Sequence, residues 1–319
     1  MNAEVNAVPG SEPEAAPTAA ARVDATRPFY WSVRRELWEH RALFIAPLVP
    51  AGIVLLFILL AAFNLAGGVH FTAPTEPGQL QGPLFGMLGM SAALIVIVAS
   101  VTAFFYCLDA LYSERRDRSI LFWKSLPVSD LTAVLSKLFV PMVAVPVIVF
   151  AVVIPTSLVM LLVATAVLLA HGVDGLWVWT ALPLFQATLW LIYVLIGSAL
   201  WFAPVYGWLL LVSAWARRST FLWAVMPPLA VCLVERLAFA TNHLWTMLRS
   251  RLAGVGQALA GTEPHSNTVK GMGRTAIAQF QDGFDPSVFF SNPALWIGLV
   301  VAAGFIAAAV WMRRYREPL

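Results

Sequence analysis

Residues 113–130 read SERRDRSILFWKSLPVSD and hold the densest charge in the chain. In the middle of this charge is a run of four large apolar residues: Ile120, Leu121, Phe122 and Trp123. The run is too short to cross a bilayer, which takes roughly 20 apolar residues. Because long apolar segments lie on both sides of it, the stretch predicts a loop on the water side between two membrane spans.

The whole chain has the composition of a membrane protein. Of its 319 residues, 60% are hydrophobic and only 12% are charged, and the mean hydropathy is +0.79. An ordinary soluble domain has roughly 25% charged residues. We therefore expect an all-α integral membrane protein, with the lipid bilayer as its surroundings and no nucleic-acid partner.

The intervals that lack Asp, Glu, Lys and Arg give the expected spans. There are six, at about residues 43–65, 84–108, 139–170, 184–214, 221–234 and 293–312. Together they form one transmembrane domain over residues 28–316. Residues 1–27 are rich in Ala, Pro and Glu, which predicts a disordered cytoplasmic tail, and they hold no apolar stretch that fits a signal peptide.

Lysines and arginines near the ends of spans indicate the orientation, since cytoplasmic loops carry the excess. With six spans, fifteen of the 20 lie on one side together with both termini, so we expect both termini in the cytoplasm. Two spans within residues 175–216 would give the same count with a different topology. That interval has Pro204 and Gly207 but no polar turn, which favours one long kinked helix.

Two amphipathic segments flank the spans. Before the first span, FYWSVRRELWEHRALF (residues 29–44) predicts an interfacial elbow helix. The residues assigned to this helix are Trp31, Arg34, Arg35, Leu37 and Trp38. The alternative is a charged helix end that merely continues the span. Between spans five and six, apolar residues recur at helical spacing over residues 235–260, which predicts an amphipathic outer segment. Residues 261–292 are rich in Gly, Pro, Asn and Ser and predict an irregular loop.

The chain lacks the motifs of the common catalytic sites. It has no G-x-x-x-x-G-K-[ST] phosphate loop, no H-E-x-x-H zinc pair and no G-x-S-x-G nucleophile turn. Its two cysteines, Cys107 and Cys232, lie in or beside apolar spans and suggest neither a disulfide nor a metal site. We expect a chain that is not an enzyme and that binds no cofactor or metal itself.

Ionisable residues near the ends of spans are candidates for a transport pathway. They are Asp109, Glu235 and Arg236, and the alternative for each is a simple role at a helix end. A proton-coupled carrier would need carboxylates or histidines deep in the bilayer, and the deep positions here carry no charge.

The run LDALYSERRDRSILFWKSLPVSDLTAVLSK (residues 108–137) resembles the first cytoplasmic loop of ATP-binding cassette (ABC) permeases of the type 2 export class. The matching positions are Glu114, Arg115, Arg116, Leu126, Pro127, Ser129 and Lys137. The elbow, the six spans and the amphipathic outer segment agree with this family, so the resemblance covers about residues 29–316. Residues 261–292 depart from it.

The resemblance implies a permease subunit of an exporter in a bacterial inner membrane. It would work by alternating access as a homodimer, driven by separate cassette ATPases that bind ATP and Mg²⁺. A cytoplasmic coupling helix between spans two and three would dock on the ATPase, with apolar anchors in a groove and arginines at its rim. The residues assigned to this coupling are Glu114, Arg115, Arg116, Asp117, Arg118, Leu121, Trp123, Lys124, Leu126 and Pro127.

Two alternatives stay open from the residues alone. The loop could be an interfacial helix that lies on anionic headgroups. The chain could also be a membrane scaffold or assembly subunit without a transport path. A membrane-embedded enzyme is disfavoured, because the sequence holds no convergent catalytic constellation.

Overall fold

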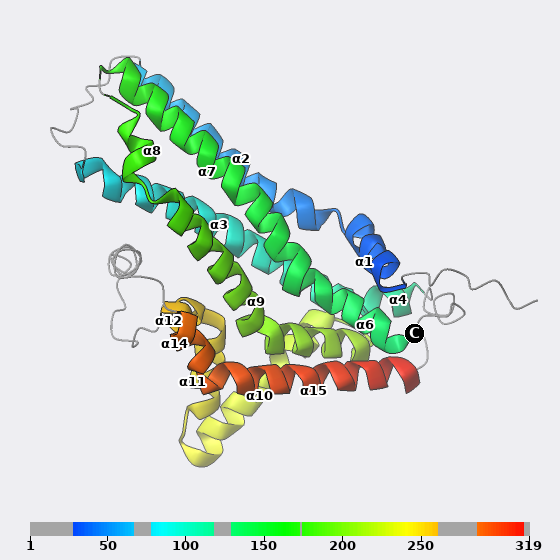
Figure 1. Cartoon of the computed structure of the whole chain (residues 1–319). Coiled ribbons are helices and arrows are strands. Elements are labelled where there is room, and N and C mark those ends of the chain that lie inside the picture. The colour runs from blue at the N-terminus through cyan, green and yellow to red at the C-terminus, as the bar shows by residue number, and fades with distance from the viewer. Residues whose placement is uncertain (1–27, 67–77, 118–128, 173, 261–285, 316–319) are drawn as a thin grey trace, which may run out of the picture.

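Every regular element that the computed structural model describes is a helix (Figure 1). The described residues are 28–66, 78–117, 129–172, 174–260 and 286–315. Within them the expectation of an all-α chain is confirmed.

Six helical segments are long and apolar enough to cross a membrane, as the sequence predicted. They are α2 (Ala42–Ala66), α3 (Gly78–Asp109), the continuous run of α6 (Asp130–Phe139), η1 (Val140–Ala144) and α7 (Val145–Ala170), α9 (Leu184–Trp215), α10 (Thr220–Phe239) and α15 (Pro293–Tyr315). The chain is therefore a multi-pass membrane protein by the length and composition of its helices.

The third span begins earlier than predicted, at Asp130 rather than at residue 139. The cause is a strong helix start, because the Ser129 side chain accepts a hydrogen bond from the Thr132 backbone N–H and Asp130 lies in the first turn. Further along, the helix widens to a π turn at η1, beside Pro141 and Pro146, which lack the N–H that a regular helix needs.

The fourth span is one helix, so the prediction against two spans in residues 175–216 is confirmed. A short helix, α8 (Trp177–Ala181), precedes it, and α9 then continues without a break past Pro204 to Trp215. Figure 1 shows that α9 changes direction along its length, with its second part running beside α15.

The core lies where α9 packs on α15 and where α2 packs on α3 and α7. The α9–α15 contact is close because Gly207 has no side chain. A β-carbon at this position would lie 3.2 Å from the Ala302 carbonyl oxygen and 3.3 Å from the Phe305 β-carbon. The ring of Trp208 packs against Phe305 one residue further on.

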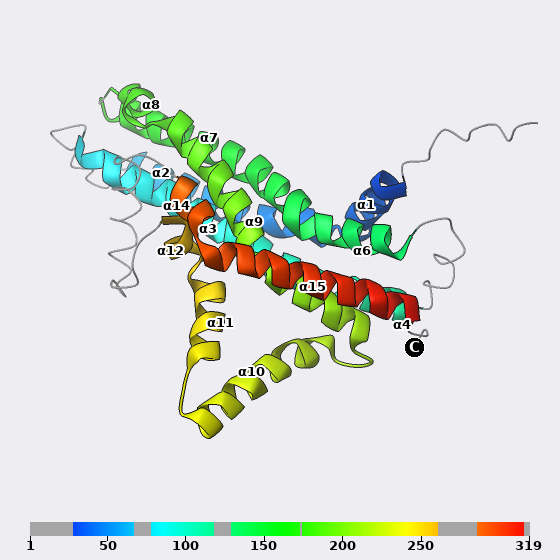
Figure 2. The ribbon, with the colours of Figure 1, turned by 60° about the horizontal axis from the view of Figure 1, so that its bottom comes forward.

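By contrast, α10 packs loosely, and Figure 2 shows that it points away from the other spans together with α11 (His243–Ala253). Its one buried residue is Ala224, whose carbonyl accepts a hydrogen bond from the Trp208 indole at 3.0 Å. The helix runs on to Phe239, beyond the predicted end of the span at residue 234.

Helix ends far apart in the sequence meet at one end of the bundle, which we call the α1 end (Figures 1 and 2). They are α1 (Pro28–Glu39), α4 (Tyr112–Arg116), the start of α6 and the last turns of α9 and α15. The first and last described helices therefore both reach the α1 end.

The segment between spans five and six forms short helices, as its periodicity predicted. Gly254 separates α11 from α12 (Val255–Ala260), and a further helix, α14 (Pro286–Ser291), lies in a region expected to be irregular. Leu259 and Phe289 are buried against α9, and the Tyr193 hydroxyl donates to the Leu259 carbonyl at 3.1 Å. The remainder of the predicted loop, residues 261–285, lies outside the described residues.

The close contact at Gly207 leads to a stability prediction. Replacing Gly207 with Leu should lower the free energy of unfolding by about 1–3 kcal/mol, because the added side chain forces α9 and α15 apart. The matched control is Gly304→Leu on α15, where an added β-carbon meets nothing within 4 Å. Unfolding in mixed detergent micelles measures both variants, and equal losses in the two would contradict the packing argument.

Candidate functional site

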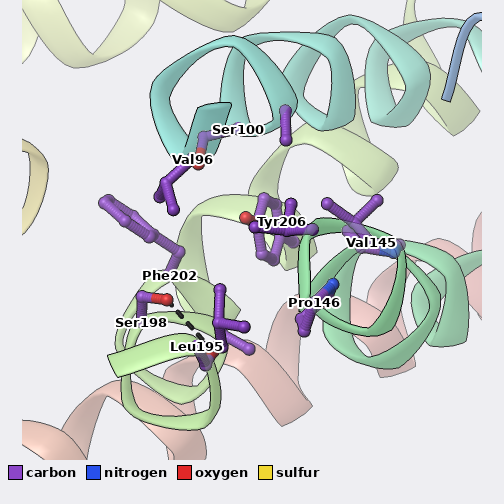
Figure 3. A pocket seen from close by; sticks show the side chains of 12 residues that line it. Val96, Ser100, Val145, Pro146, Leu195, Ser198, Phe202 and Tyr206 are labelled. Carbon is purple, nitrogen blue, oxygen red and sulfur yellow. Dashed lines mark hydrogen bonds between the residues drawn. The ribbon is translucent and has the colours of Figure 1, made fainter. Parts of the chain in front are cut away.

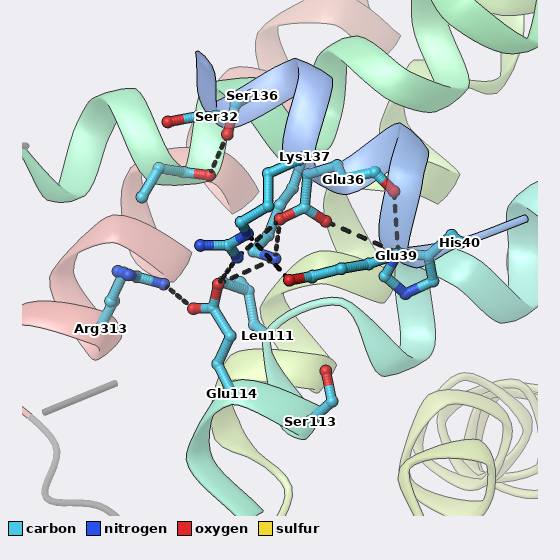
Figure 4. Close-up of polar contacts among 12 residues, drawn as sticks. Ser32, Glu36, Glu39, His40, Leu111, Ser113, Glu114, Ser136, Lys137 and Arg313 are labelled. Atoms are coloured by element: carbon cyan, nitrogen blue, oxygen red, sulfur yellow. Dashed lines mark hydrogen bonds and ion pairs between the residues drawn. The ribbon is translucent and has the colours of Figure 1, made fainter. Parts of the chain in front are cut away.

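The charged side chains at the α1 end form a buried ion-pair network (Figure 4). Its members come from α1, α4, α6 and α15: Arg35, Glu36, Glu114, Asp130, Lys137 and Arg313. Three are basic and three are acidic, so the charges of these six residues balance when all are ionised.

Glu36 is the first centre of the network. It lies on the face of α1 that packs against α6, together with Val33, and is only 2% exposed. Its carboxylate accepts hydrogen bonds from the Lys137 ammonium at 2.8 Å and from the Tyr106 hydroxyl at 3.0 Å. A buried carboxylate needs such partners, because an unpaired charge in the interior is costly.

Glu114 on α4 is the second centre. One carboxylate oxygen lies 2.8 Å from Arg35 and 3.1 Å from Lys137, and the other lies 2.5 Å from Arg313. Arg313 also reaches Asp130, with its Nε 3.1 Å from the carboxylate. Lys137 thus bridges the two buried glutamates, and Arg313 bridges Glu114 to the start of α6.

The pKa of Arg35 shows how this balance works. Burial disfavours its charge, but Glu36 and Glu114 outweigh that effect and raise the pKa above its usual value. The guanidinium also lies 3.3 Å from the exposed Glu39 one turn along α1. The sequence analysis assigned Arg35 only to the elbow helix, and in the structure its side chain joins the network through Glu36 and Glu114.

Arg115 fastens α4 to the end of α9. Its guanidinium donates to the carbonyl oxygens of Ser213, at 3.1 Å, and Ala216. In return, the Ser213 hydroxyl accepts hydrogen bonds from the backbone N–H groups of Leu111 and Tyr112. The sequence interpretation placed Arg115 at the exposed rim of a partner interface, whereas the side chain is only 3% exposed. Arg115 therefore has a structural role, because its hydrogen bonds join α4 to the end of α9.

The other predicted coupling residues divide into two groups. Arg116 and Asp117 are exposed and form an ion pair with each other at 3.1 Å. The rest lie outside the described residues: Arg118, Leu121, Trp123, Lys124, Leu126 and Pro127.

The predicted elbow helix exists as α1, although its placement at an interface stays a prediction. Trp31 and Trp38 are 56% and 68% exposed, and the Arg34 guanidinium lies over both rings. Leu37 is half-buried and packs against the core. The helix therefore has one face turned to the bundle and one turned away from it.

The three span-end candidates do not meet in one site. Asp109 is half-buried at the end of α3, and its carbonyl accepts a hydrogen bond from Ser113. Glu235 caps the start of α11, because its carboxylate accepts the His243 and Leu244 backbone N–H groups at 2.8 Å each. Arg236 is exposed beside it. For Glu235 the geometry favours the role at a helix end.

Arg251 on α11 is a buried basic residue that the sequence interpretation did not select. Its guanidinium lies 4.2 Å from the centre of the Trp201 ring and donates to the carbonyls of Trp201 and Ala294. No carboxylate pairs with it in the described part of the chain, and burial lowers its pKa. Arg251 thus joins α11 to α9 and α15 through carbonyls and an aromatic face.

A small pocket lies inside the bundle between α3, α9 and the η1–α7 segment (Figure 3). Its volume is about 20 Å³, which is room for roughly one water molecule. Ser100, Ser198 and Tyr206 line it together with apolar side chains and the two prolines at the π turn. The pocket thus brings three hydroxyl groups together in an otherwise apolar part of the bundle.

The sequence interpretation gave Glu36 and Arg313 no role and named Lys137 only as a position that matches the permease loop. Glu36 had a signal, because it follows Val33 by three residues and so lies on the same apolar face of the predicted helix. An ionisable residue on such a face requires a partner. Lys137 and Arg313 had no comparable signal, since both stand at span ends where basic residues are common.

Comparisons with protein-family models, with curated proteins and with solved structures found no match. Within the described residues, no group of three His, Cys, Asp or Glu side chains could hold a metal ion.

The network predicts strong coupling between Glu36 and Lys137. Lys137→Met should lower the free energy of unfolding by about 3–5 kcal/mol, because it leaves a buried carboxylate without its nearest cation. Adding Glu36→Gln should restore part of this loss, since the double variant is again neutral. Unfolding in mixed micelles measures the free energy for the two single variants and the double variant. The control is Asp117→Asn in the exposed pair, which should change stability by less than about 1 kcal/mol. Strictly additive losses would contradict a buried pair.

Proposed function

We propose that the chain is the membrane permease subunit of an ABC exporter, powered by a separate cassette ATPase. The observation that carries the proposal is the ion-pair network, because it includes Glu114 and Asp130, which flank residues 118–128 in the sequence. This is the segment to which the sequence assigned the contact with the ATPase.

The two anchors of the segment are Glu114 before it and Asp130 after it. Both carboxylates bind the same guanidinium, that of Arg313 near the end of α15. Glu114 is in addition held by Lys137 of α6 and Arg35 of α1. A force on residues 118–128 would therefore act on three other helices at once.

This arrangement fits the transmission of movement from a partner on the water side. Buried ion pairs are rigid only while every charge is matched, so a displaced carboxylate must take its cations with it. In the proposed mechanism, closure of the ATPase moves the coupling segment, and the network passes the movement to α1, α6 and α15. Arg116 and Asp117 would supply polar contacts at the edge of the docking surface.

The transport path is proposed to open at the small pocket where polar side chains lie between spans. The pocket at Ser100, Ser198 and Tyr206 lies between three spans and next to the π turn of span three. A π turn marks a place where a helix can change its register. A second copy of the chain would complete the path, in a bacterial inner membrane with both termini in the cytoplasm.

The decisive test is co-expression with a cassette ATPase encoded beside this chain, followed by purification and measurement of ATP turnover. A stable complex with substrate-dependent ATP turnover is expected. Trp123→Ala should reduce that turnover roughly tenfold or more, because a large apolar anchor at an interface carries much of its binding energy. The control is Trp245→Ala on α11, which removes another exposed tryptophan and should leave turnover unchanged.

Two outcomes would reject the proposal. Turnover that is unaffected by Trp123→Ala and Arg116→Ala would exclude docking through residues 118–128. A chain that folds and inserts normally, but never retains an ATPase, would instead fit a membrane scaffold.

A further inference from the structure

The outward face of α1 differs sharply from the face that joins the network. Its exposed side chains are mostly aromatic, with Tyr30 54%, Trp31 56% and Trp38 68% exposed, and the half-buried Arg34 lies among them. The Arg34 guanidinium carbon lies 5.2 Å from the centre of the Trp31 ring and 4.6 Å from that of Trp38. One helix thus presents a cation held between two indoles.

The geometry follows from helix spacing. Trp31 and Trp38 stand three residues before and four residues after Arg34, so all three side chains lie on one face. Stacking on aromatic rings uses the flat faces of a guanidinium and leaves its N–H edge free to donate. Arg35, the next residue, directs its charge inward to Glu36 and Glu114. Arg34 has no such carboxylate partner among the described residues.

The position of this face relative to the first span identifies what covers it. Helix α1 ends at Glu39, and α2 begins at Ala42. The first turns of α2 expose Ile45, Leu48 and Val49, each more than half exposed, and a span with such side chains faces lipid tails. Exposed apolar side chains of the first span thus begin within a few residues of α1, and a helix at the end of a span is expected at the level of the headgroups.

The same end of the bundle repeats the combination of aromatic and basic residues. Trp311 and Tyr315 are exposed on the last turns of α15, with Arg314 over the Tyr315 ring at 5.8 Å. At the α9–α10 turn, Arg217 and Arg218 are exposed. Tryptophan and tyrosine prefer the membrane–water interface, and basic residues there attract anionic lipids.

We propose that the outward face of α1 is a docking surface for anionic phospholipid headgroups. Arg34 donates to the lipid phosphate, and Trp31 and Trp38 fix the guanidinium while their rings lie beside the glycerol region. This inference goes beyond transport, since it requires only that the chain lies in a membrane.

The test uses the full chain in a non-ionic detergent, titrated with short-chain phosphatidylglycerol or with phosphatidylcholine of the same chain length. The readout is the rise in the thermal unfolding midpoint, which gives an apparent affinity for each lipid. Phosphatidylglycerol should bind more tightly than phosphatidylcholine. Arg34→Gln should lower the apparent affinity for phosphatidylglycerol roughly fivefold, which is the effect of one basic residue near a headgroup. The apparent affinity for phosphatidylcholine should stay unchanged.

Three further variants make the result specific. Arg218→Gln removes an exposed arginine that lies at the same end of the bundle but has no indole against it among the described residues. It should lower the affinity for phosphatidylglycerol clearly less than Arg34→Gln does. Arg34→Lys keeps the charge but loses the flat guanidinium that lies over the indoles, so it should retain only part of the preference. Trp31→Ala with Trp38→Ala should weaken binding although every charge remains.

The proposal is overturned if wild type and Arg34→Gln show the same preference for phosphatidylglycerol. It is also overturned if the wild type shows no preference, and Arg34→Gln instead releases a copurified cassette ATPase, because the face would then bind a protein. The lipid titration uses the chain without an ATPase, so a missing preference for phosphatidylglycerol leaves docking through residues 118–128 untouched. Release of the ATPase by Arg34→Gln would instead place part of its contact on α1, so failure of this proposal and failure of the proposed function can be told apart.

Discussion

Two buried carboxylates at the α1 end, Glu36 and Glu114, impose the strongest constraint on this structure. Neither can be ionised in the interior without cations close by, and the cations come from other parts of the chain. Lys137 serves both, and Arg313 comes from the last span, 199 residues beyond Glu114. Hydrophobic packing alone would let the helices slide and rotate, whereas this pairing fixes which ends must meet.

The requirement for matched charge also explains why the α1 end is built from so many elements. A single helix offers only side chains a turn apart, such as Glu39 for Arg35, and these cannot surround a carboxylate on all sides. Glu114 is bonded from α1, α6 and α15 because each helix supplies one direction of approach. Glu114 and Asp130, which stand on either side of residues 118–128 in the sequence, are thus both held at this junction.

Much of the fold follows from the sequence, and most of the site does not. Long intervals without charge predict the six spans, because a helix in lipid must satisfy its own backbone and present apolar side chains. The absence of a polar turn correctly predicts α9 as one helix. The limits of the spans follow less directly, since the Ser129 cap extends span three into a region that hydropathy alone assigns to the loop.

Pairings such as Arg313 with Glu114 depend on how the spans pack, and local sequence patterns do not predict that packing. Arg115 shows the same limit, because a basic residue in a charged loop gives no sign that a Ser213 carbonyl lies within reach.

The two ways in which this chain buries an arginine suggest how its two ends differ. Arg35 is buried among carboxylates, which raise its pKa, so its charge is held firmly. Arg251 is buried against an indole and carbonyl oxygens, and burial lowers its pKa. Carbonyls and a ring face attract a cation without neutralising it, so this joint resists separation less than a full ion pair does. Helix α10, which leads into α11, has little packing to hold it otherwise. A movement that enters at the α1 end would therefore reach α15 through the ion pairs of Arg313, whereas α10, with one buried residue, would receive little of it.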